Sequence, residues 1–514
     1  MWQPRSTWHY EADVVILGYG GAGAVAAITA HDAGRDVLIL EKQPADRRHP
    51  STLMSGGSIV CPSDPDGAFE HMRHLARTGT DEEETGADVL RVWADRCAQN
   101  VDWVAAHGGA THLFSAVGEH HAIPGHEAIQ SYRFGTGQAG DPGRGFGLYR
   151  WLQDLVAARS IGVEYDVTAQ WLLTDTAGAV IGVLASRGGR PIKVRARRAV
   201  ILTTGGFEFH DGLKRHHLRV SPTHFYASPD NTGDGVTMAQ EIGAALWHMS
   251  ACSAKAIAKF PDFPTGFPVN FWGYGDGLTQ EQILYGGGKQ NASCGAIQVD
   301  QLGRRFTSEV WKQHTHYYEL TVFDSQRGLY PRVPSYWIFD SGRMRRGQLV
   351  NRETGAAGPL RLYPWSDDNE AELERGWIVR GDTIEDLART LAMEPATLRQ
   401  TLREYNAGCE SGVDSLGPPP YGRPAGTLVP LEPPFYAMRL WPGGPNTQGG
   451  PERNARAQVM RVTGEPVPRL YSAGELGSVY GMLYPIGGGN LAECIAFGRV
   501  AGEQASTETP YVPR

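Results

Sequence analysis

The six residues from 18 to 23, Gly-Tyr-Gly-Gly-Ala-Gly, have the spacing GxGxxG. In such a motif the first glycine makes a tight turn, the second lets the backbone approach a pyrophosphate, and the third lets a helix pack close to a strand. A helix N-terminus adds positive potential for the phosphates. Glu41 follows the last glycine by eighteen residues and is placed to accept hydrogen bonds from both hydroxyls of a ribose. These residues predict a dinucleotide site.

The elements that must position this motif are visible around it. Residues 12–42 read as a strand, a glycine turn, a helix of small residues and a second strand. Two further apolar runs, 197–207 and 468–478, also lead into glycines. Strands that are so far apart in the chain predict one sheet assembled from distant segments. The expected fold class is α/β, with a doubly wound Rossmann-like domain.

Residues 251–440, which lie between the second and third of these apolar runs, differ in composition, with more aromatic, proline and basic residues. It also predicts two short helices, at 383–392 and 394–406. We therefore expect an interrupted cofactor domain. Its first part is 1–250, an α+β cap or substrate domain covers 251–440, and its second part is 441–514.

The bulk composition excludes several classes of protein. The chain has 514 residues, of which 41% are hydrophobic, and a net charge of −8, which gives no reason to expect nucleic acid or anionic lipid as a partner. No apolar run approaches the ~20 residues of a membrane span. The six cysteines show no CxxC, haem or zinc spacing and predict reduced thiols in a cytoplasmic protein.

Other segments favour FAD over NAD as the dinucleotide. Residues 49–57 supply small hydroxyl residues and a glycine pair, Asp234 lies in a glycine turn before a helix, and Glu475 ends the third strand. A long flavin needs contacts of this kind spread along its ribityl chain and ring.

With these motifs in this order, the chain resembles the flavoprotein superfamily of fumarate reductases and 3-ketosteroid dehydrogenases. The matching stretches also include "GRRFTSE" at 303–309, "NTQGG" at 446–450 and "GGGNLAECIAFGRVAG" at 487–502. The resemblance implies a doubly wound FAD domain interrupted by a cap. It also implies chemistry at a carbon–carbon bond beside a carbonyl, with hydride passing to or from flavin N5.

The resemblance also implies which residues contact FAD. In some relatives a histidine links FAD covalently, but that place holds Pro50 here and His49 is one position off, so we expect non-covalent FAD. The helix after the last glycines is expected to stabilise the negative charge of reduced flavin. The expected cofactor residues are Gly18, Gly20, Gly21, Ala22, Gly23, Glu41, Lys42, Ser51, Thr52, Ser55, Gly56, Gly57, Ala169, Thr204, Gly205, Asp234, Glu475, Asn490 and Leu491.

Departures from the fumarate reductase pattern bear on the substrate. In the matched motifs, Pro485 replaces a carboxylate-binding arginine and Asn446 replaces a histidine, while a second histidine falls near Lys255 or Ser253. A buried dianion without cationic partners is costly. A simple fumarate or succinate enzyme is therefore disfavoured.

The closing loop instead resembles that of the ketosteroid (Δ1/Δ4) dehydrogenases, in which a tyrosine and a glycine four residues later donate to a ketone oxygen. Here these are Tyr484 and Gly488. Losing one such donor typically costs ~3–4 kcal/mol of barrier. We expect desaturation of a 3-oxosteroid or another hydrophobic cyclic ketone, or reduction of the matching enone. In the plainer alternative, Tyr484 only packs against the flavin.

The acid/base residue is less determined. Residues 308–320 offer Lys312, His314, His316, Tyr317 and Tyr318, of which Tyr318 and His314 are the candidates. Tyr132 is a candidate for the substrate pocket. The histidines at 120, 121 and 126 predict a solvated loop rather than a metal site.

Three other functions stay open at this point. One is reduction of an unsaturated acid held by Lys255, Arg343 or Arg345, and another is amine oxidation of the aspartate-oxidase kind. The third is a flavin-bound sensor without turnover. The chain shows no haem motif, so we expect a diffusible electron donor or acceptor.

Overall fold

The computed structural model describes residues 8–77, 82–116, 118–120, 122–138, 141, 143–270, 295–309, 314–352, 354–419 and 421–512. The chain divides into two compact units. Unit 1 comprises Met1–Leu218, Ala227–Cys252 and Asn446–Arg514, and unit 2 comprises Arg219–Tyr226 and Ser253–Pro445.

The centre of unit 1 is a largely parallel sheet with the strand order β19-β20-β9-β1-β2-β6, extended by β7 and β8. Strand β1 (Tyr10–Leu17) pairs in parallel with β2 (Val37–Leu40) and with β9 (Arg190–Leu202), which is far away in sequence. Their apolar runs are buried along their length, as expected for parallel strands that are covered on both faces. The predicted α/β class, with a sheet built from distant segments, is confirmed.

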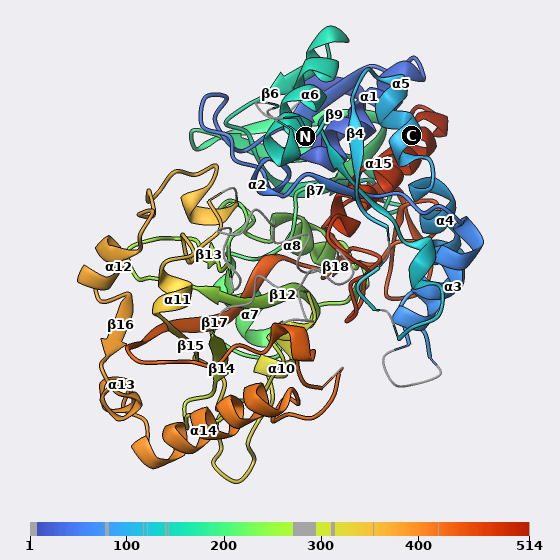
Figure 1. The fold of residues 1–514 in the computed structure, drawn as a ribbon. Helices are drawn as coiled ribbons and strands as arrows, with labels where there is room; N and C mark the ends of the chain where they lie inside the picture. The colour runs from blue at the N-terminus through green and yellow to red at the C-terminus, as the bar shows by residue number, and fades with distance from the viewer. Residues whose placement is uncertain are drawn as a thin grey trace. The chain divides into compact units, whose positions relative to one another are not determined.

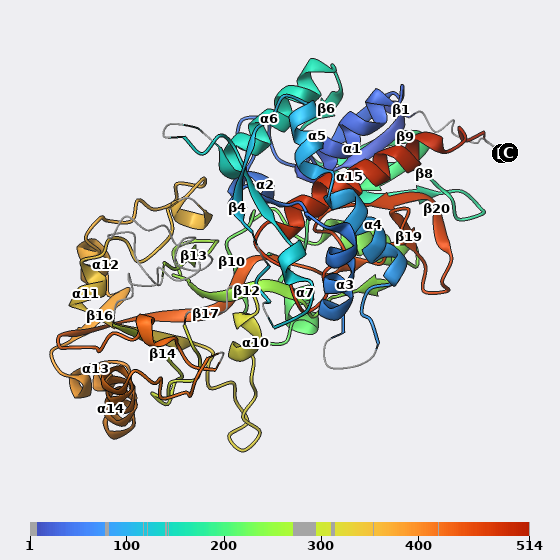
Figure 2. The ribbon, with the colours of Figure 1, turned by 45° about the vertical axis from the view of Figure 1, so that its right-hand side comes forward.

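Two helices from opposite ends of the chain pack side by side in unit 1 (Figures 1 and 2). They are α1 (Gly21–Asp32) and α15 (Gly489–Thr507). A Cβ added at Gly498 would lie 3.0 Å from the Ala22 carbonyl oxygen, and one at Gly502 would lie 2.7 Å from the Ala26 carbonyl oxygen. Glycines in α15 and small residues in α1 thus allow close contact between the two helices.

The other elements of unit 1 include two small sheets, β3-β5-β4 and β11-β18. The remaining bounds are α2 (Ser51–Met54), β3 (Ser58–Val60), α3 (Pro65–Leu75), α4 (Ala87–Cys97), α5 (Asn100–Ala106), β4 (Thr111–Ser115), η1 (His126–Ala128), β5 (Ser131–Phe134), α6 (Arg144–Ala158), β6 (Gly162–Glu164), β7 (Thr168–Thr174), β8 (Val180–Arg187), α7 (Asp211–His217), α8 (Asp234–Glu241), β11 (Leu246–Trp247), β18 (Gly450–Pro451), β19 (Gln458–Met460) and β20 (Pro466–Ser472).

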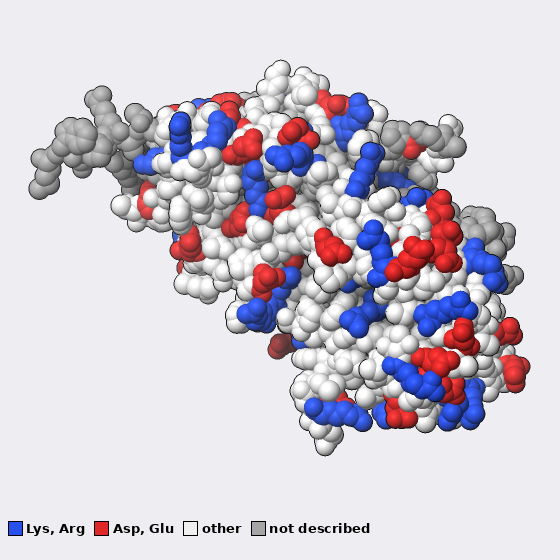
Figure 3. Space-filling view, turned by 90° about the vertical axis from the view of Figure 1, so that its left-hand side faces the viewer, with Lys and Arg blue, Asp and Glu red and all other residues white. Residues whose placement is uncertain are grey.

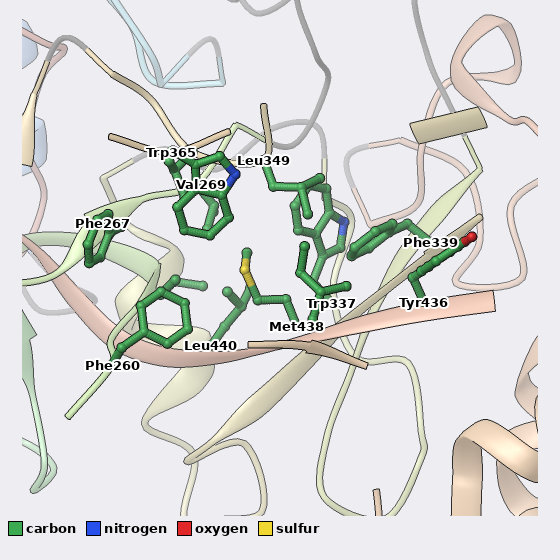
Figure 4. Packing of buried hydrophobic residues seen from close by; sticks show 14 of the residues in the cluster. Phe260, Phe267, Val269, Trp337, Phe339, Leu349, Trp365, Tyr436, Met438 and Leu440 are labelled. Carbon is green, nitrogen blue, oxygen red and sulfur yellow. The ribbon is translucent and has the colours of Figure 1, made fainter. Parts of the chain in front are cut away.

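Unit 2 is built on a seven-stranded sheet with the order β13-β12-β17-β15-β14, to which β10 and β16 add by pairing with β17. Side chains such as Trp337, Trp365 and Met438 form a buried cluster on this sheet (Figure 4). The helices expected at 383–392 and 394–406 are α13 (Ile384–Thr390) and α14 (Pro395–Ser411). The Thr383 hydroxyl caps α13 by accepting the Asp386 N–H at 3.1 Å.

The remaining bounds in unit 2 are β10 (His224–Phe225), β12 (Cys252–Ala258), β13 (Phe267–Pro268), β14 (Ala296–Val299), α10 (His316–Leu320), β15 (Ser335–Asp340), α11 (Ser341–Met344), η2 (Gly355–Ala357), α12 (Glu370–Glu374), β16 (Ile378–Gly381), η3 (Ala425–Thr427) and β17 (Phe435–Thr447). The first residue of β12 and the last two residues of β17 are assigned to unit 1.

The surface offers no simple electrostatic signature on the face drawn in Figure 3. Basic and acidic side chains are interspersed there rather than sorted into patches of one sign (Figure 3). Within the described ranges, we find no helix with the length and apolar character needed to traverse a bilayer.

Candidate cofactor and active site

The glycine turn between β1 and α1 has two crowded positions and one open position. A Cβ at Gly18, where φ is +99°, would lie 2.5 Å from the Thr203 carbonyl oxygen, and one at Gly23 would lie 2.1 Å from the Gly18 carbonyl oxygen. A Cβ at Gly20 would meet only Thr52 Oγ1, at 3.8 Å. Gly20 therefore borders open space at the N-terminus of α1, which fits a pyrophosphate group.

Most of the expected cofactor residues line one cavity in unit 1 beside this turn. These residues are Gly18, Gly20, Gly21, Ala22, Glu41, Lys42, Ser51, Thr52, Ala169, Thr204, Gly205, Asp234 and Glu475. They come from the ends of β1, β2, β9 and β20 and from α1, α2, α8 and β7, so the fold brings together segments that are widely separated in sequence.

Glu41 is fixed at the end of β2 by two backbone donors. Its Oε2 accepts the Tyr19 N–H at 2.8 Å, and its Oε1 accepts the Gln43 N–H at 2.7 Å. Burial raises the pKa of this carboxyl, although the two N–H donors oppose that shift. Each carboxylate oxygen still has a second lone pair for a ribose hydroxyl.

Lys42 and Asp234 meet across the same cavity. Lys42 Nζ lies 2.8 Å from Asp234 Oδ2 and donates to Thr232 Oγ1 at 2.7 Å. Asp234 is the first residue of α8. The ion pair ties the β2 end to the start of α8, and it places one cation and one anion at the site instead of a net charge.

Six expected cofactor residues do not line this cavity, namely Gly23, Ser55, Gly56, Gly57, Asn490 and Leu491. Gly57 has φ +68°, and a Cβ there would lie 2.1 Å from the Arg144 carbonyl carbon, at the start of α6. Ser55 Oγ donates to the Thr52 carbonyl at 2.7 Å and accepts the Gly57 N–H at 3.1 Å. Ser55 and Gly57 thus shape the turn after α2.

Tyr484 is held against the start of α15. Its side chain is buried, and its hydroxyl accepts the Asn490 N–H at 2.7 Å. Gly488, with φ +106°, precedes α15 and has no side chain to cap it, so the Tyr484 hydroxyl serves as the acceptor that helix starts need. Burial raises the pKa of Tyr484 above its ordinary value, which keeps the phenol protonated.

A loop from residues 118–120 contacts the Tyr484 loop. His120 Nε2 donates to the Tyr484 carbonyl at 2.8 Å, the Glu119 N–H donates to the Pro485 carbonyl at 3.0 Å, and Glu119 Oε1 accepts the Gly487 N–H at 3.2 Å. The expectation of a solvated loop is therefore wrong for His120. This contact could not be predicted because its residues are far apart in the sequence. Residue 121 lies outside the described residues.

The other catalytic candidates lie in different settings. The Tyr132 hydroxyl donates to Gln130 Oε1 at 3.1 Å, while the neighbouring Ser131 hydroxyl donates to the Gly487 carbonyl at 2.9 Å. Successive side chains of a strand point to opposite faces, so Tyr132 faces away from the loop that contains Gly487. In unit 2, the Arg219 guanidinium lies 5.1 Å from the Tyr318 ring centroid.

His314 also lies in unit 2, where its carbonyl accepts the Ala254 N–H at 3.2 Å. Lys312 lies outside the described residues. Of the cations considered for a carboxylate substrate, Arg343 is fully buried and donates to the carbonyls of Asn270, Gly347 and Gln348 at 2.6–2.9 Å. Arg343 thus holds its own loop together.

Sequence reasoning missed several residues that organise the cavity. Asn231 Nδ2 donates to Ser51 Oγ at 3.0 Å and lies 3.4 Å from Glu475 Oε1. Thr447 and Glu208 hydrogen-bond to each other nearby. The available signals were their positions, since Asn231 directly precedes the "TGDG" turn and Glu208 directly follows "TTGGF".

The cavity, the open Gly20 position and the buried Glu41 carboxylate together fit a dinucleotide. Residues 13–491 match the family model described as "FAD binding domain". The chain belongs to this FAD-binding family. FAD is its cofactor, and the protein is an FAD-dependent oxidoreductase, as the sequence predicts.

Relatives of this flavoprotein include both expected branches. The fumarate reductase (cytochrome) of Shewanella frigidimarina is 26% identical over 506 residues, covering 97% of this chain and 77% of the relative. The 3-oxosteroid 1-dehydrogenase of Mycobacterium tuberculosis is 25% identical over 587 residues, covering 96% of this chain and 97% of the relative.

A similar fold is seen in the solved structure of 3-ketosteroid delta1-dehydrogenase from Sterolibacterium denitrificans in complex with 1,4-androstadiene-3,17-dione. The TM-score is 0.79 at 21% identity, covering 96% of this chain and 99% of the other. The flavoprotein therefore has the fold of the fumarate reductase and ketosteroid dehydrogenase type.

Proposed function

We propose that this flavoprotein acts on the CH–CH bond beside a ketone, desaturating a 3-oxosteroid or another cyclic ketone, or reducing the matching enone. The observation that carries the proposal is the Tyr484 hydroxyl fixed on the Asn490 N–H at 2.7 Å, at the start of α15. A dehydrogenase named for a 3-oxosteroid is among the relatives, which supports the same assignment.

Tyr484 and Gly488 would polarise the substrate carbonyl. A hydroxyl that accepts one hydrogen bond becomes a stronger donor through the other, so the Asn490 N–H prepares Tyr484 to donate to a ketone oxygen. No hydrogen bond from the Gly488 N–H is found among the described residues, which leaves it available as a second donor. Together they would stabilise enolate charge as an oxyanion hole does.

FAD, when bound, supplies a hydride acceptor or donor at N5. Gly20, the N-terminus of α1, Glu41 and Ser51 would hold its diphosphate and ribose end along the cavity. Tyr318 and His314 are our candidates for moving the proton alpha to the carbonyl. Tyr132, which faces away from the loop that contains Gly487, is our candidate for contact with a part of the substrate remote from the ketone.

We further infer that FAD is held without a covalent bond and exchanges electrons with a diffusible partner. Pro50 occupies the position of a linking histidine, and the His49 ring hydrogen-bonds to the Arg47 carbonyl at 3.1 Å.

Reduction of an unsaturated acid is the second candidate, and it is favoured by the fumarate reductase relative. The buried position of Arg343 and its three carbonyl partners argue against that residue as the carboxylate-binding group.

To test this, the FAD-loaded protein is mixed anaerobically with 4-androstene-3,17-dione or 4-oxocyclohexanecarboxylate. The reaction is monitored by the absorbance of the flavin. In parallel, the photoreduced protein is mixed with cyclohexenone or fumarate. Bleaching by a ketone, or reoxidation by the enone with none by fumarate, would support the proposal. Reoxidation by fumarate alone would favour the acid reductase.

A further inference from the structure

Two glutamates meet where two neighbouring parallel strands end. Strands β9 and β20 pair in parallel, with Leu202 beside Ser472. Each strand runs into a glycine turn that ends in a glutamate, Glu208 after β9 and Glu475 after β20. Because carboxyl ends of parallel strands lie at one edge of a sheet, the two side chains converge there.

Gly206 marks how close the two carboxyl groups are. A Cβ at this residue would lie 2.5 Å from Glu208 Oε1 and 2.8 Å from Glu475 Oε1. With both oxygens within 3 Å of this one point, the two carboxyl groups are neighbours, and a hydrogen bond between them would require a proton. Glu208 is fully buried, while Glu475 is half-buried and borders the FAD cavity.

The donors around the pair are unequal. Glu208 Oε1 accepts the Thr447 N–H at 2.6 Å and the Thr447 hydroxyl at 2.7 Å. The hydroxyl is oriented for this, since its oxygen accepts the Phe207 N–H at 3.2 Å. Glu475 Oε1 accepts longer bonds, from the Gly206 N–H at 3.2 Å and from Asn231 Nδ2 at 3.4 Å.

This difference favours the proton on Glu475 rather than on Glu208. Hydrogen bonds donated to a carboxylate favour its charged form, and two carboxylates in one buried site cannot both be charged at neutral pH. Among the described residues no donor reaches Glu208 Oε2, a fully buried atom. A proton on Glu475 would supply that missing donor.

We propose that Glu208 and Glu475 bind one proton between them, carried by Glu475 and donated to Glu208 Oε2. Glu475 then faces FAD as a neutral acid, and the charge of the pair stays on the side of Glu208 and Thr447. Glu208 is thus a positioning residue that keeps negative charge away from an anionic cofactor. The inference depends on FAD binding, which the family establishes, and not on the proposed substrate.

Other ionisable groups lie around Glu475. Burial and the nearby Glu208 raise the pKa of Glu475 well above its ordinary value. The further groups that face Glu475 or share its cavity are Tyr484, Cys494, Glu41, the Lys42–Asp234 pair and the buried Arg453–Glu493 pair, in which Arg453 lies near the Gly474 carbonyl.

Two isosteric variants separate the roles of the glutamates. In Glu475→Gln the amide mimics the neutral acid and can donate to Glu208, so FAD affinity at pH 7.5 should fall less than in Glu208→Gln. In Glu208→Gln the neighbouring charge that helps to keep Glu475 protonated is removed, so Glu475 ionises more readily beside the cofactor. FAD binding should then weaken about tenfold, because a carboxylate charge repels the anionic cofactor.

FAD affinity is measured by flavin fluorescence titration of the apoprotein, and folding of each variant is checked by circular dichroism. Infrared spectra of the proteins at pH 7.5 provide a second readout that needs no FAD. The carbonyl-stretch band of protonated carboxylic acids should be weaker in both variants than in the wild type. Equal weakening of FAD binding by the two variants, or no weakening of that band in Glu475→Gln, would overturn the proposal.

Discussion

Replacing Tyr484 by phenylalanine removes one hydroxyl from the start of α15. The ring is buried and lies 5.0 Å from the Tyr480 ring, so the apolar packing survives the change. Two things are lost: the acceptor for the Asn490 N–H at 2.7 Å and, under the proposed function, a donor to the substrate ketone. These losses have different magnitudes and different readouts.

The structural loss equals that of a helix cap. An Asn490 N–H without its acceptor should lower the free energy of unfolding by about 1 kcal/mol. The catalytic loss is larger, because removal of one oxyanion-hole donor lowers kcat by about 10²–10³, or ~2.7–4 kcal/mol of barrier. FAD content should be unchanged, since Tyr484 does not line the FAD cavity.

Tyr480→Phe is the matched control. The Tyr480 hydroxyl accepts the Trp93 Nε1–H at 2.7 Å and donates to the Gly489 carbonyl at 2.9 Å, at the same helix start. Its removal leaves two buried partners unsatisfied and should destabilise the protein by roughly 2 kcal/mol. The rate of flavin reduction per bound FAD should nevertheless remain close to that of wild type.

The assay is stopped-flow flavin reduction with the ketone that bleaches the wild-type protein, scaled to bound FAD. A Tyr484→Phe rate within threefold of wild type would refute the ketone-polarising role. An equal loss in Tyr480→Phe would show that the effect comes from distortion of the helix start.

Three further results are expected. Gly20→Ala should fold normally yet lose most FAD affinity. Gly23→Ala, whose Cβ would lie 2.1 Å from the Gly18 carbonyl oxygen, should instead lose roughly 1–3 kcal/mol of stability. Thermal melts and FAD titrations test this, and similar behaviour of the two variants would contradict it. Arg343→Ala should destabilise the protein by roughly 3 kcal/mol in denaturant unfolding, because it leaves buried carbonyls without donors; an unchanged melt with selective loss of fumarate turnover would instead support the acid reductase. Burial lowers the pKa of His71 to about 4. Between pH ~6.5 and ~4 the unfolded chain therefore binds more protons than the folded protein. The free energy of unfolding should fall by roughly 3 kcal/mol as the pH drops through that window. His71→Asn, whose amide can also donate to the Pro124 carbonyl, should show a flatter profile, and equal slopes would contradict the assignment.

The sequence predicted the parts of the fold that depend on local pattern. The strand, glycine turn, helix and strand of residues 12–42 follow from apolar periodicity and from the glycines of the turn. At Gly18 and Gly23 a side chain would collide with nearby backbone, so glycine is required there for local steric reasons. The joining of residues 197–207 and 468–478 to one sheet was also predictable, because both are apolar runs that end in glycines.

Contacts made by side chains across long separations were not predictable in this way. Nothing in the spacing indicated that His120 bonds to the Tyr484 carbonyl, or that Glu208 reaches Glu475. Arg343 shows the converse limit. In the sequence, Arg343 is a cation near a family motif. Only the structure shows that this residue is buried and donates hydrogen bonds to three backbone carbonyls.

The pairing of α1 with α15 has a consequence for biosynthesis. Gly498 and Gly502 fit against α1, and β20 occupies an interior place in the sheet beside β9. A ribosome delivers residues 10–40 first and residues 466–507 hundreds of codons later, so the nascent chain holds an incomplete flavin domain for most of its translation. The flavin domain is therefore completed only after residues 466–507 have been made.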